Sequence, residues 1–204
     1  MSDIREEIVN FGKLLYQRRL NFGYGGNLSF RRGERIFITP AGLPKHRLSP
    51  EQILETDLEG KPLTEGRPSS ESRMHFEIYK TRTEVNAIIH AHPPFLTVMA
   101  VTGQDFIPIL PEMEMVLGKI AKIPYFRPGT AELALAVKEG MRESKVGVLL
   151  NHGALSIGHS LEEAFDFLEM AESFARTLVF SNLQGKFNIL TPQEVEFFRG
   201  KASH

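Results

Sequence analysis

The chain has 204 residues, 42% of them hydrophobic, which is enough for one substantial core but short for two domains. The 24 lysines and arginines nearly balance the 25 aspartates and glutamates, and a net charge of -1 excludes the basic surface of a nucleic-acid or anionic-membrane binder. Because cysteine is absent, disulfides, thiolate catalysis and cysteine-bound metals are excluded. We therefore expect a single domain over residues 1–204.

The sequence also lacks the features of a targeted or membrane protein. Residues 1–7 contain neither a basic start nor an apolar stretch, and no later run approaches the roughly 20 apolar residues of a membrane span. We expect a cytoplasmic protein with no membrane or nucleic-acid partner.

Helix and strand patterns alternate along the chain without a linker or an internal repeat. Apolar residues spaced three and four apart predict helices, and short apolar runs bounded by turn residues predict strands. Two capping-box patterns, Ser160–Glu163 and Thr191–Glu194, mark the starts of the last two helices. In order, we predict a helix over 4–15, a strand hairpin over 27–30 and 35–39, a helical turn at 49–51, a strand over 53–58, a helix from 69 or 70 to 81, a strand over 85–89, helices over 94–101 and 130–141, a strand over 146–150, a helix to about 183 and a short helix from 192.

Two histidine segments follow strand-like runs. Alternate side chains of a strand share a face, so His90 and His92 can point their imidazoles at one place. His152 follows a second apolar run and can complete a triangle. Neutral imidazole is the usual protein ligand for zinc, and catalytic zinc commonly keeps three protein ligands. The pattern predicts a metal site. The alternative is a strand end with one histidine in solvent and the other bonded to backbone.

A candidate anion site precedes the first of these segments. Ser69, Ser70 and Glu71 stand at a predicted helix start, where free N–H groups and the helix dipole favour an anion such as phosphate. An ordinary serine cap with an acidic first turn explains the same residues. Residues 24–29 and 38–42 are likewise either phosphate-binding loops or ordinary turns. Glycine lets a backbone approach phosphate closely, but it is also common in turns.

Taken together, five ordered motifs between residues 22 and 183 resemble those of the class II aldolase/adducin family. Within that family, the chain is most similar to the branch that cleaves L-fuculose 1-phosphate. The motifs are Gly26-Asn27-Leu28-Ser29, Thr39-Pro40-Ala41-Gly42, Pro68-Ser69-Ser70-Glu71, His90-Ala91-His92 and Asn151-His152-Gly153.

The resemblance implies an α/β fold: a three-layer sandwich with a central, mostly antiparallel sheet flanked by helices. It implies a homotetramer with active sites at the subunit interfaces. It also implies one Zn²⁺ per subunit on His90, His92 and His152, with Glu71 as a movable fourth ligand and as the catalytic acid and base.

By the same resemblance, four residues would hold the substrate phosphate: Asn27, Gly42, Ser69 and Ser70. Ala41 and Tyr24 stand where some relatives have threonine, so one or two of the phosphate hydrogen bonds are expected to differ.

Glu112 marks a departure from that branch. Some of its members carry a catalytic tyrosine after an Ile-Pro segment, contributed across a subunit boundary, and Glu112 occupies the nearest equivalent position here. It is either a replacement acid or a carboxylate at the surface or at a helix start. His75 shares a helix face with Glu71, but its apolar neighbours favour a packed or hydrogen-bonded histidine.

The implied reaction is the reversible cleavage of a ketose 1-phosphate, with L-fuculose 1-phosphate preferred, to dihydroxyacetone phosphate and an aldehyde through a metal-stabilised enediolate. No lysine is singled out for Schiff-base chemistry, and zinc can act as the Lewis acid instead. The Ser69-Ser70-Glu71 sequence at this helix start argues against an epimerase, because the same helix start in the epimerase relatives resembles an Asp-Thr pattern. A methylthioribulose 1-phosphate dehydratase remains an alternative. A non-catalytic adducin-like module is disfavoured, because such modules lack the three histidines.

Overall fold

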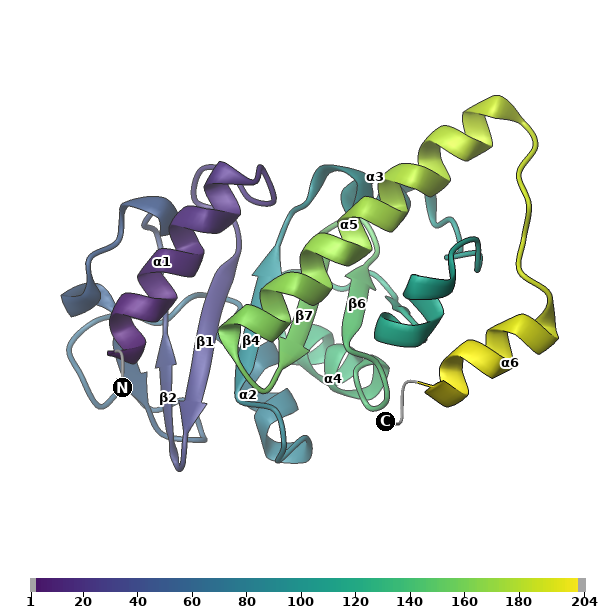
Figure 1. Ribbon diagram of the computed structural model, residues 1–204. Coiled ribbons are helices and arrows are strands. Elements are labelled where there is room, and N and C mark those ends of the chain that lie inside the picture. Colours follow the sequence, from purple (N-terminus) through teal and green to yellow (C-terminus); the bar gives the residue numbers. More distant parts are fainter. Residues whose placement is uncertain (1–2, 202–204) are drawn as a thin grey trace.

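The computed structural model describes residues 3–201, and one sheet of seven strands runs through it (Figure 1). Its order is β3-β2-β1-β4-β7-β6-β5, and every neighbouring pair is antiparallel except β5 and β6. The strands are β1 (Asn27–Arg32), β2 (Arg35–Ile38), β3 (Leu54–Thr56), β4 (Ala87–Ala91), β5 (Ala121–Ile123), β6 (Val146–Leu149) and β7 (Gly153–Gly158). The predicted mostly antiparallel α/β fold is confirmed.

Helices cover both faces of this sheet, which gives three layers (Figure 1). On one face, α1, α3 and α5 pack over the larger apolar cluster, whereas α2 and α4 pack over the second cluster on the opposite face. The helices are α1 (Ile4–Gln17), α2 (Ser72–Thr81), α3 (Pro94–Thr102), α4 (Ala131–Gly140), α5 (Leu161–Gln184) and α6 (Pro192–Lys201). Three short helical turns complete the elements: η1 (Lys45–Arg47), η2 (Pro50–Gln52) and the π-helical η3 (Met113–Leu117).

Helix α2 begins later than the predicted start at Ser69 or Ser70. The Ser69 N–H donates to the Thr39 carbonyl oxygen at 3.2 Å, and Pro68 forms a β-bridge with Pro40. These contacts keep the backbone extended through Ser69. The helix therefore starts at Ser72, with Glu71 as its N-cap residue.

The strands also differ from the predicted ones. Strand β4 lies two residues closer to the C-terminus than the predicted strand over 85–89, so it includes His90. The predicted strand over 53–58 shortens to β3, and β5 and β7 were not predicted. Every residue of β7 is buried, so its sequence shows no alternation of polar and apolar residues.

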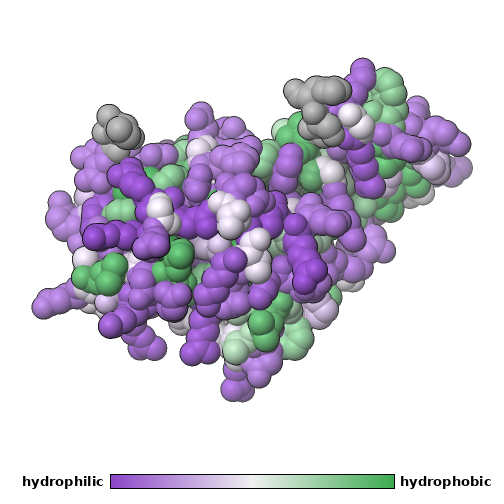
Figure 2. All heavy atoms as spheres, turned by 90° about the horizontal axis from the view of Figure 1, so that it is seen from below, coloured by the Kyte–Doolittle hydropathy of each residue, from purple (hydrophilic) through white to green (hydrophobic). Residues whose placement is uncertain are grey.

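The surface agrees with the balanced composition. Seen from below, it is mainly hydrophilic, and apolar residues lie in separate groups among polar ones (Figure 2). None of the helices within residues 3–201 combines the length and apolar character needed to cross a membrane.

Candidate metal centre

His90 is fixed inside the sheet. Its neighbours across the strands are Asn27 of β1 and Leu155 of β7, and the residue is fully buried. The Nδ1 atom lies 2.9 Å from the Ala154 carbonyl oxygen, and because a carbonyl only accepts, Nδ1 must donate. The lone pair is then on Nε2, which is buried without a hydrogen-bond partner. This is the arrangement of a histidine oriented by backbone for metal binding.

His92 lies just beyond β4 and is held between two glycines. A Cβ atom on Gly25 would stand 2.6 Å from His92 Nδ1, and one on Gly153 would overlap His92 Cδ2. Burial lowers the pKa of His92 to about 3, with smaller contributions from the imidazoles of His90 and His152. The ring is therefore neutral at pH 7, the form that binds metal.

His152 occupies the tight turn between β6 and β7. Asn151 before it adopts a left-handed backbone with φ of 57°, and the His152 N–H donates to the Leu149 carbonyl oxygen at 3.1 Å. Because β7 pairs with β4, this turn carries the third imidazole to the other two. The ring centroid of His152 lies 4.8 Å from that of His90 and 5.4 Å from that of His92.

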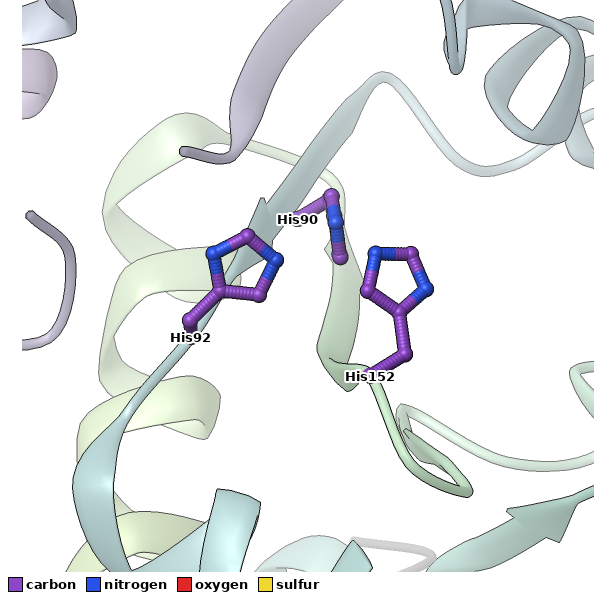
Figure 3. A group of neighbouring side chains, drawn as sticks. All are labelled: His90, His92 and His152. Carbon is purple, nitrogen blue, oxygen red and sulfur yellow. The ribbon is translucent and has the colours of Figure 1, made fainter. Parts of the chain in front are cut away.

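The three predicted histidines thus form a group that can hold a metal ion. One donor nitrogen from each lies within 4.8 Å of the others, and His92 and His152 each turn a nitrogen towards the space beside His90 (Figure 3). Zinc–nitrogen bonds of about 2.0–2.1 Å in a tetrahedral site separate ligand nitrogens by roughly 3.4 Å. The three rings are therefore close enough together to share one ion.

Glu71 faces the same space. Its Oε1 lies 3.1 Å from His152 Nε2 and its Oε2 lies 3.3 Å from His90 Nε2. Burial favours the neutral acid, but the imidazoles of His152 and His90 outweigh it and hold the pKa of Glu71 well below its usual range. Glu71 is therefore a carboxylate next to two candidate ligand nitrogens.

The residues expected to bind phosphate lie on segments joined by Thr39. The Thr39 hydroxyl accepts from the Leu28 N–H at 3.2 Å, next to Asn27, and the Thr39 carbonyl accepts from Ser69. Both polar atoms of the Asn27 amide are buried without a partner. Ser69 is buried and Ser70 is exposed, while Gly42 is an exposed turn residue with φ of 72°.

Glu112 stands directly before η3 in the chain. It is exposed with a helical backbone, and within the described part of the chain its carboxylate forms no hydrogen bond or ion pair. Its suggested role as an acid stays a prediction.

Two further residues support the loop over residues 22–26, and no sequence pattern singled them out. The Asn21 amide donates to the Gly25 carbonyl oxygen at 2.6 Å, and Lys45 Nζ donates to the Tyr24 carbonyl oxygen at 3.2 Å. Neither residue belongs to a motif or a periodic face, so only the folded chain reveals these contacts.

This geometry agrees with comparisons to known proteins. A family model described as the class II aldolase and adducin N-terminal domain matches residues 6–179. The chain belongs to the class II aldolase and adducin family. Class II aldolases are metal-dependent, which agrees with the histidine group, and the expected class II aldolase type of enzyme is confirmed.

Individual relatives of this class II aldolase family member differ in their named reactions. An L-fuculose phosphate aldolase of Methanococcus maripaludis is 37% identical over 179 residues, which cover 87% of this chain and 98% of that protein. A 3-oxo-tetronate 4-phosphate decarboxylase of Haemophilus influenzae is 35% identical, with 96% and 97% of the two chains covered. A solved L-fuculose 1-phosphate aldolase structure, 30% identical, superposes with a TM-score of 0.94 over 100% of this chain and 98% of its own.

Proposed function

We propose that this protein is a zinc-dependent lyase that reversibly cleaves a ketose 1-phosphate, with L-fuculose 1-phosphate as the first candidate. The products would be dihydroxyacetone phosphate and an aldehyde. The observation that carries the proposal is a group of three imidazoles, of which those of His90 and His152 contact the Glu71 carboxylate, beside the buried and unpartnered amide of Asn27. The named reaction of the Methanococcus relative supports the choice of substrate.

The residues present fit zinc. All three donors are imidazole nitrogens, and His90 directs a buried lone pair without a partner towards the group. A bound zinc ion would supply a Lewis acid that draws electron density from the carbonyl and hydroxyl oxygens of the substrate. The bond from His90 Nδ1 to the Ala154 carbonyl would fix which nitrogen coordinates.

Glu71 would carry the proton. Cleavage of the C–C bond leaves an electron pair on the dihydroxyacetone phosphate fragment as an enediolate, and a base close to that carbon must exchange its proton. Glu71 is ionised and sits at the start of α2, next to His90 and His152. Substrate binding would release it from those rings for this task.

The phosphate group would lie against Asn27, Gly42, Ser69 and Ser70. Burying both amide atoms of Asn27 without partners is costly, and a phosphate oxygen would accept from its NH₂ group. Contacts with phosphate are remote from the reacting carbon, so they orient the substrate and select phosphorylated sugars. In the proposed homotetramer, the exposed Glu112 would reach a neighbouring subunit's site and protonate the aldehyde oxygen.

A second candidate is decarboxylation of a 3-oxo-acid phosphate, which is supported by the Haemophilus relative at 35% identity. Loss of CO₂ from such an acid also leaves an enediolate, so Glu71 would protonate a similar carbon. The methylthioribulose 1-phosphate dehydratase has no comparable support among the relatives described above.

A product-resolved assay tests these alternatives. Purified protein, with its metal content measured, is supplemented with zinc and given L-fuculose 1-phosphate, L-rhamnulose 1-phosphate, ribulose phosphates, methylthioribulose 1-phosphate and 3-oxo-tetronate 4-phosphate. We expect dihydroxyacetone phosphate together with an aldehyde. Release of CO₂ from the last substrate alone would instead establish the decarboxylase, and a protein that neither binds metal nor converts any substrate would overturn both.

A further inference from the structure

Lys45 occupies an unusual place for a lysine. It begins η1 with 3% of its surface exposed, and no other lysine or arginine between residues 3 and 201 is buried. Lysine is almost never buried unless its charge is paired. Burial lowers the pKa of Lys45, and the charge of the Glu71 carboxylate opposes that shift in part.

Its ammonium group joins two loops. Nζ donates to the Leu43 carbonyl oxygen at 2.8 Å and to the Tyr24 carbonyl oxygen at 3.2 Å. Tyr24 belongs to the loop over residues 22–26, which leads directly into Asn27. Leu43 ends the turn over residues 40–43, which contains Gly42. An ammonium has three N–H donors, so one remains for a further acceptor.

The backbone of Lys45 is fixed from the opposite direction. A Cβ atom on Gly12 of α1 would stand 2.6 Å from the Lys45 carbonyl oxygen, so helix and turn are in close contact there. Lys45 is therefore anchored to the core through α1 while its side chain ends at the two loops. A flexible surface lysine would have neither the backbone contact with α1 nor the two bonds from its ammonium group.

The positive charge of Lys45 is complementary to a phosphorylated substrate. A sugar phosphate carries a charge of about −1.5 to −2 at neutral pH, and it would be held beside Asn27, whose buried amide supplies no charge. A buried ammonium joined to both loops would supply a positive charge for that phosphate, in a medium where charges interact strongly.

We propose that Lys45 is a positioning residue of the phosphate subsite, which ties residues 22–26 to residues 40–43 and supplies the buried positive charge opposite the substrate phosphate. This inference rests on the proposed function, because it requires a phosphorylated substrate bound near Asn27. It predicts a defect in phosphate recognition that is separate from metal binding.

Calorimetric titration of the zinc-loaded protein tests the inference, with inorganic phosphate and dihydroxyacetone phosphate as probes. Lys45→Met should bind both about tenfold more weakly or worse. With the phosphorylated sugar as substrate, the KM of Lys45→Met should rise by a similar factor while its kcat changes much less. Its zinc content should stay at one ion per chain. The matched control is Lys13→Met, which removes an exposed lysine next to Gly12 and should leave both affinities within about twofold.

The outcomes separate the two proposals. Wild-type affinities in Lys45→Met would overturn the role of Lys45 and leave the proposed function intact, as would a loss of zinc or of kcat without a loss of phosphate affinity. If the zinc-loaded wild-type protein binds neither probe, both proposals fall. Should Lys45→Met not fold, hydrogen exchange of the wild-type protein decides: phosphate should slow exchange in both loops, and slowing in one or neither would overturn the inference.

Discussion

Replacing Gly25 by alanine should weaken zinc binding, because its new Cβ atom would stand 2.6 Å from His92 Nδ1. Atoms of this size normally stay about 3.5 Å apart, so the ring or the loop must move by roughly 0.9 Å. Gly25 is not among the glycines with positive φ, so alanine adds no backbone strain and the effect is steric. The loop cannot retreat easily, because Asn21 holds the Gly25 carbonyl at 2.6 Å.

The ring itself is also confined. Gly153 lies against Cδ2 of His92, so the imidazole cannot move away from Gly25 without meeting β7. Metal–ligand bonds tolerate deviations of only about 0.2 Å, well below the required displacement. We therefore expect zinc affinity to fall about 10- to 100-fold, or about 1.4–2.7 kcal/mol, the range found when the support of a metal ligand is disturbed.

Competition with a chromophoric chelator, starting from metal-free protein, measures this loss. Gly200→Ala is the matched control, since a Cβ atom there meets nothing within 4 Å, and its zinc affinity should equal that of the wild type. Melting temperatures without metal show whether each variant folds. A folded Gly25→Ala protein that binds zinc within twofold of the wild type would refute the reasoning.

Three further changes probe separate parts of the chain. Glu71→Gln should keep zinc and phosphate binding but stop exchange of the carbon-bound proton of dihydroxyacetone phosphate in D₂O, and normal exchange by NMR would rule out Glu71 as the base. Burial chiefly lowers the pKa of the fully buried His75, to about 3. Below about pH 6.5 only the unfolded chain takes up that proton, so the free energy of unfolding should fall by up to about 1.4 kcal/mol per pH unit down to pH 3. His75→Gln should lack this contribution in urea titrations with chelator between pH 7 and pH 5, and parallel curves would contradict it. Arg199→Met leaves the Glu114 carboxylate, 2% exposed, without its partner at 2.6 Å. Unfolding in urea should show a loss of about 1–3 kcal/mol, which adding Glu114→Gln should largely restore; no restoration would argue against the ion pair.

Elements with strong local patterns were predicted well. Helices α1, α4 and α5 combine an apolar face with a capping side chain, and Asp3, Thr130 and Ser160 each accept a backbone N–H at the helix start. The second capping box forms fully, with reciprocal bonds between Thr191 and Glu194. The first forms only in part, because Glu163 accepts from the His159 N–H instead of that of Ser160. Local chemistry thus fixes where these helices begin.

Features that depend on distant pairing were not predictable in this way. The spacing of His90 and His92 indicated a shared face, but their approach to His152 requires β7 to pair with β4, and β7 has no polar alternation. His75 was expected to be packed or hydrogen-bonded, and its Nδ1 indeed lies 2.7 Å from the Ser29 hydroxyl in a fully buried site. Lys45 stands in a basic run that resembles surface, and its burial depends on Gly12, 33 residues earlier in the chain.

The late start of α2 connects the two halves of the candidate site. The Ser69 N–H donates to the Thr39 carbonyl oxygen before the helix begins, and α2 starts only at Ser72. Extended backbone through Ser69 leaves Glu71 as the N-cap residue, where it reaches the nitrogens of His90 and His152. Thr39 therefore connects the segments that carry Asn27 and Ser69, and through Ser69 it also influences where the Glu71 carboxylate lies. A substrate held there by its phosphate would present its reacting carbon at a fixed distance from Glu71, which is how remote binding contacts become useful to a proton transfer.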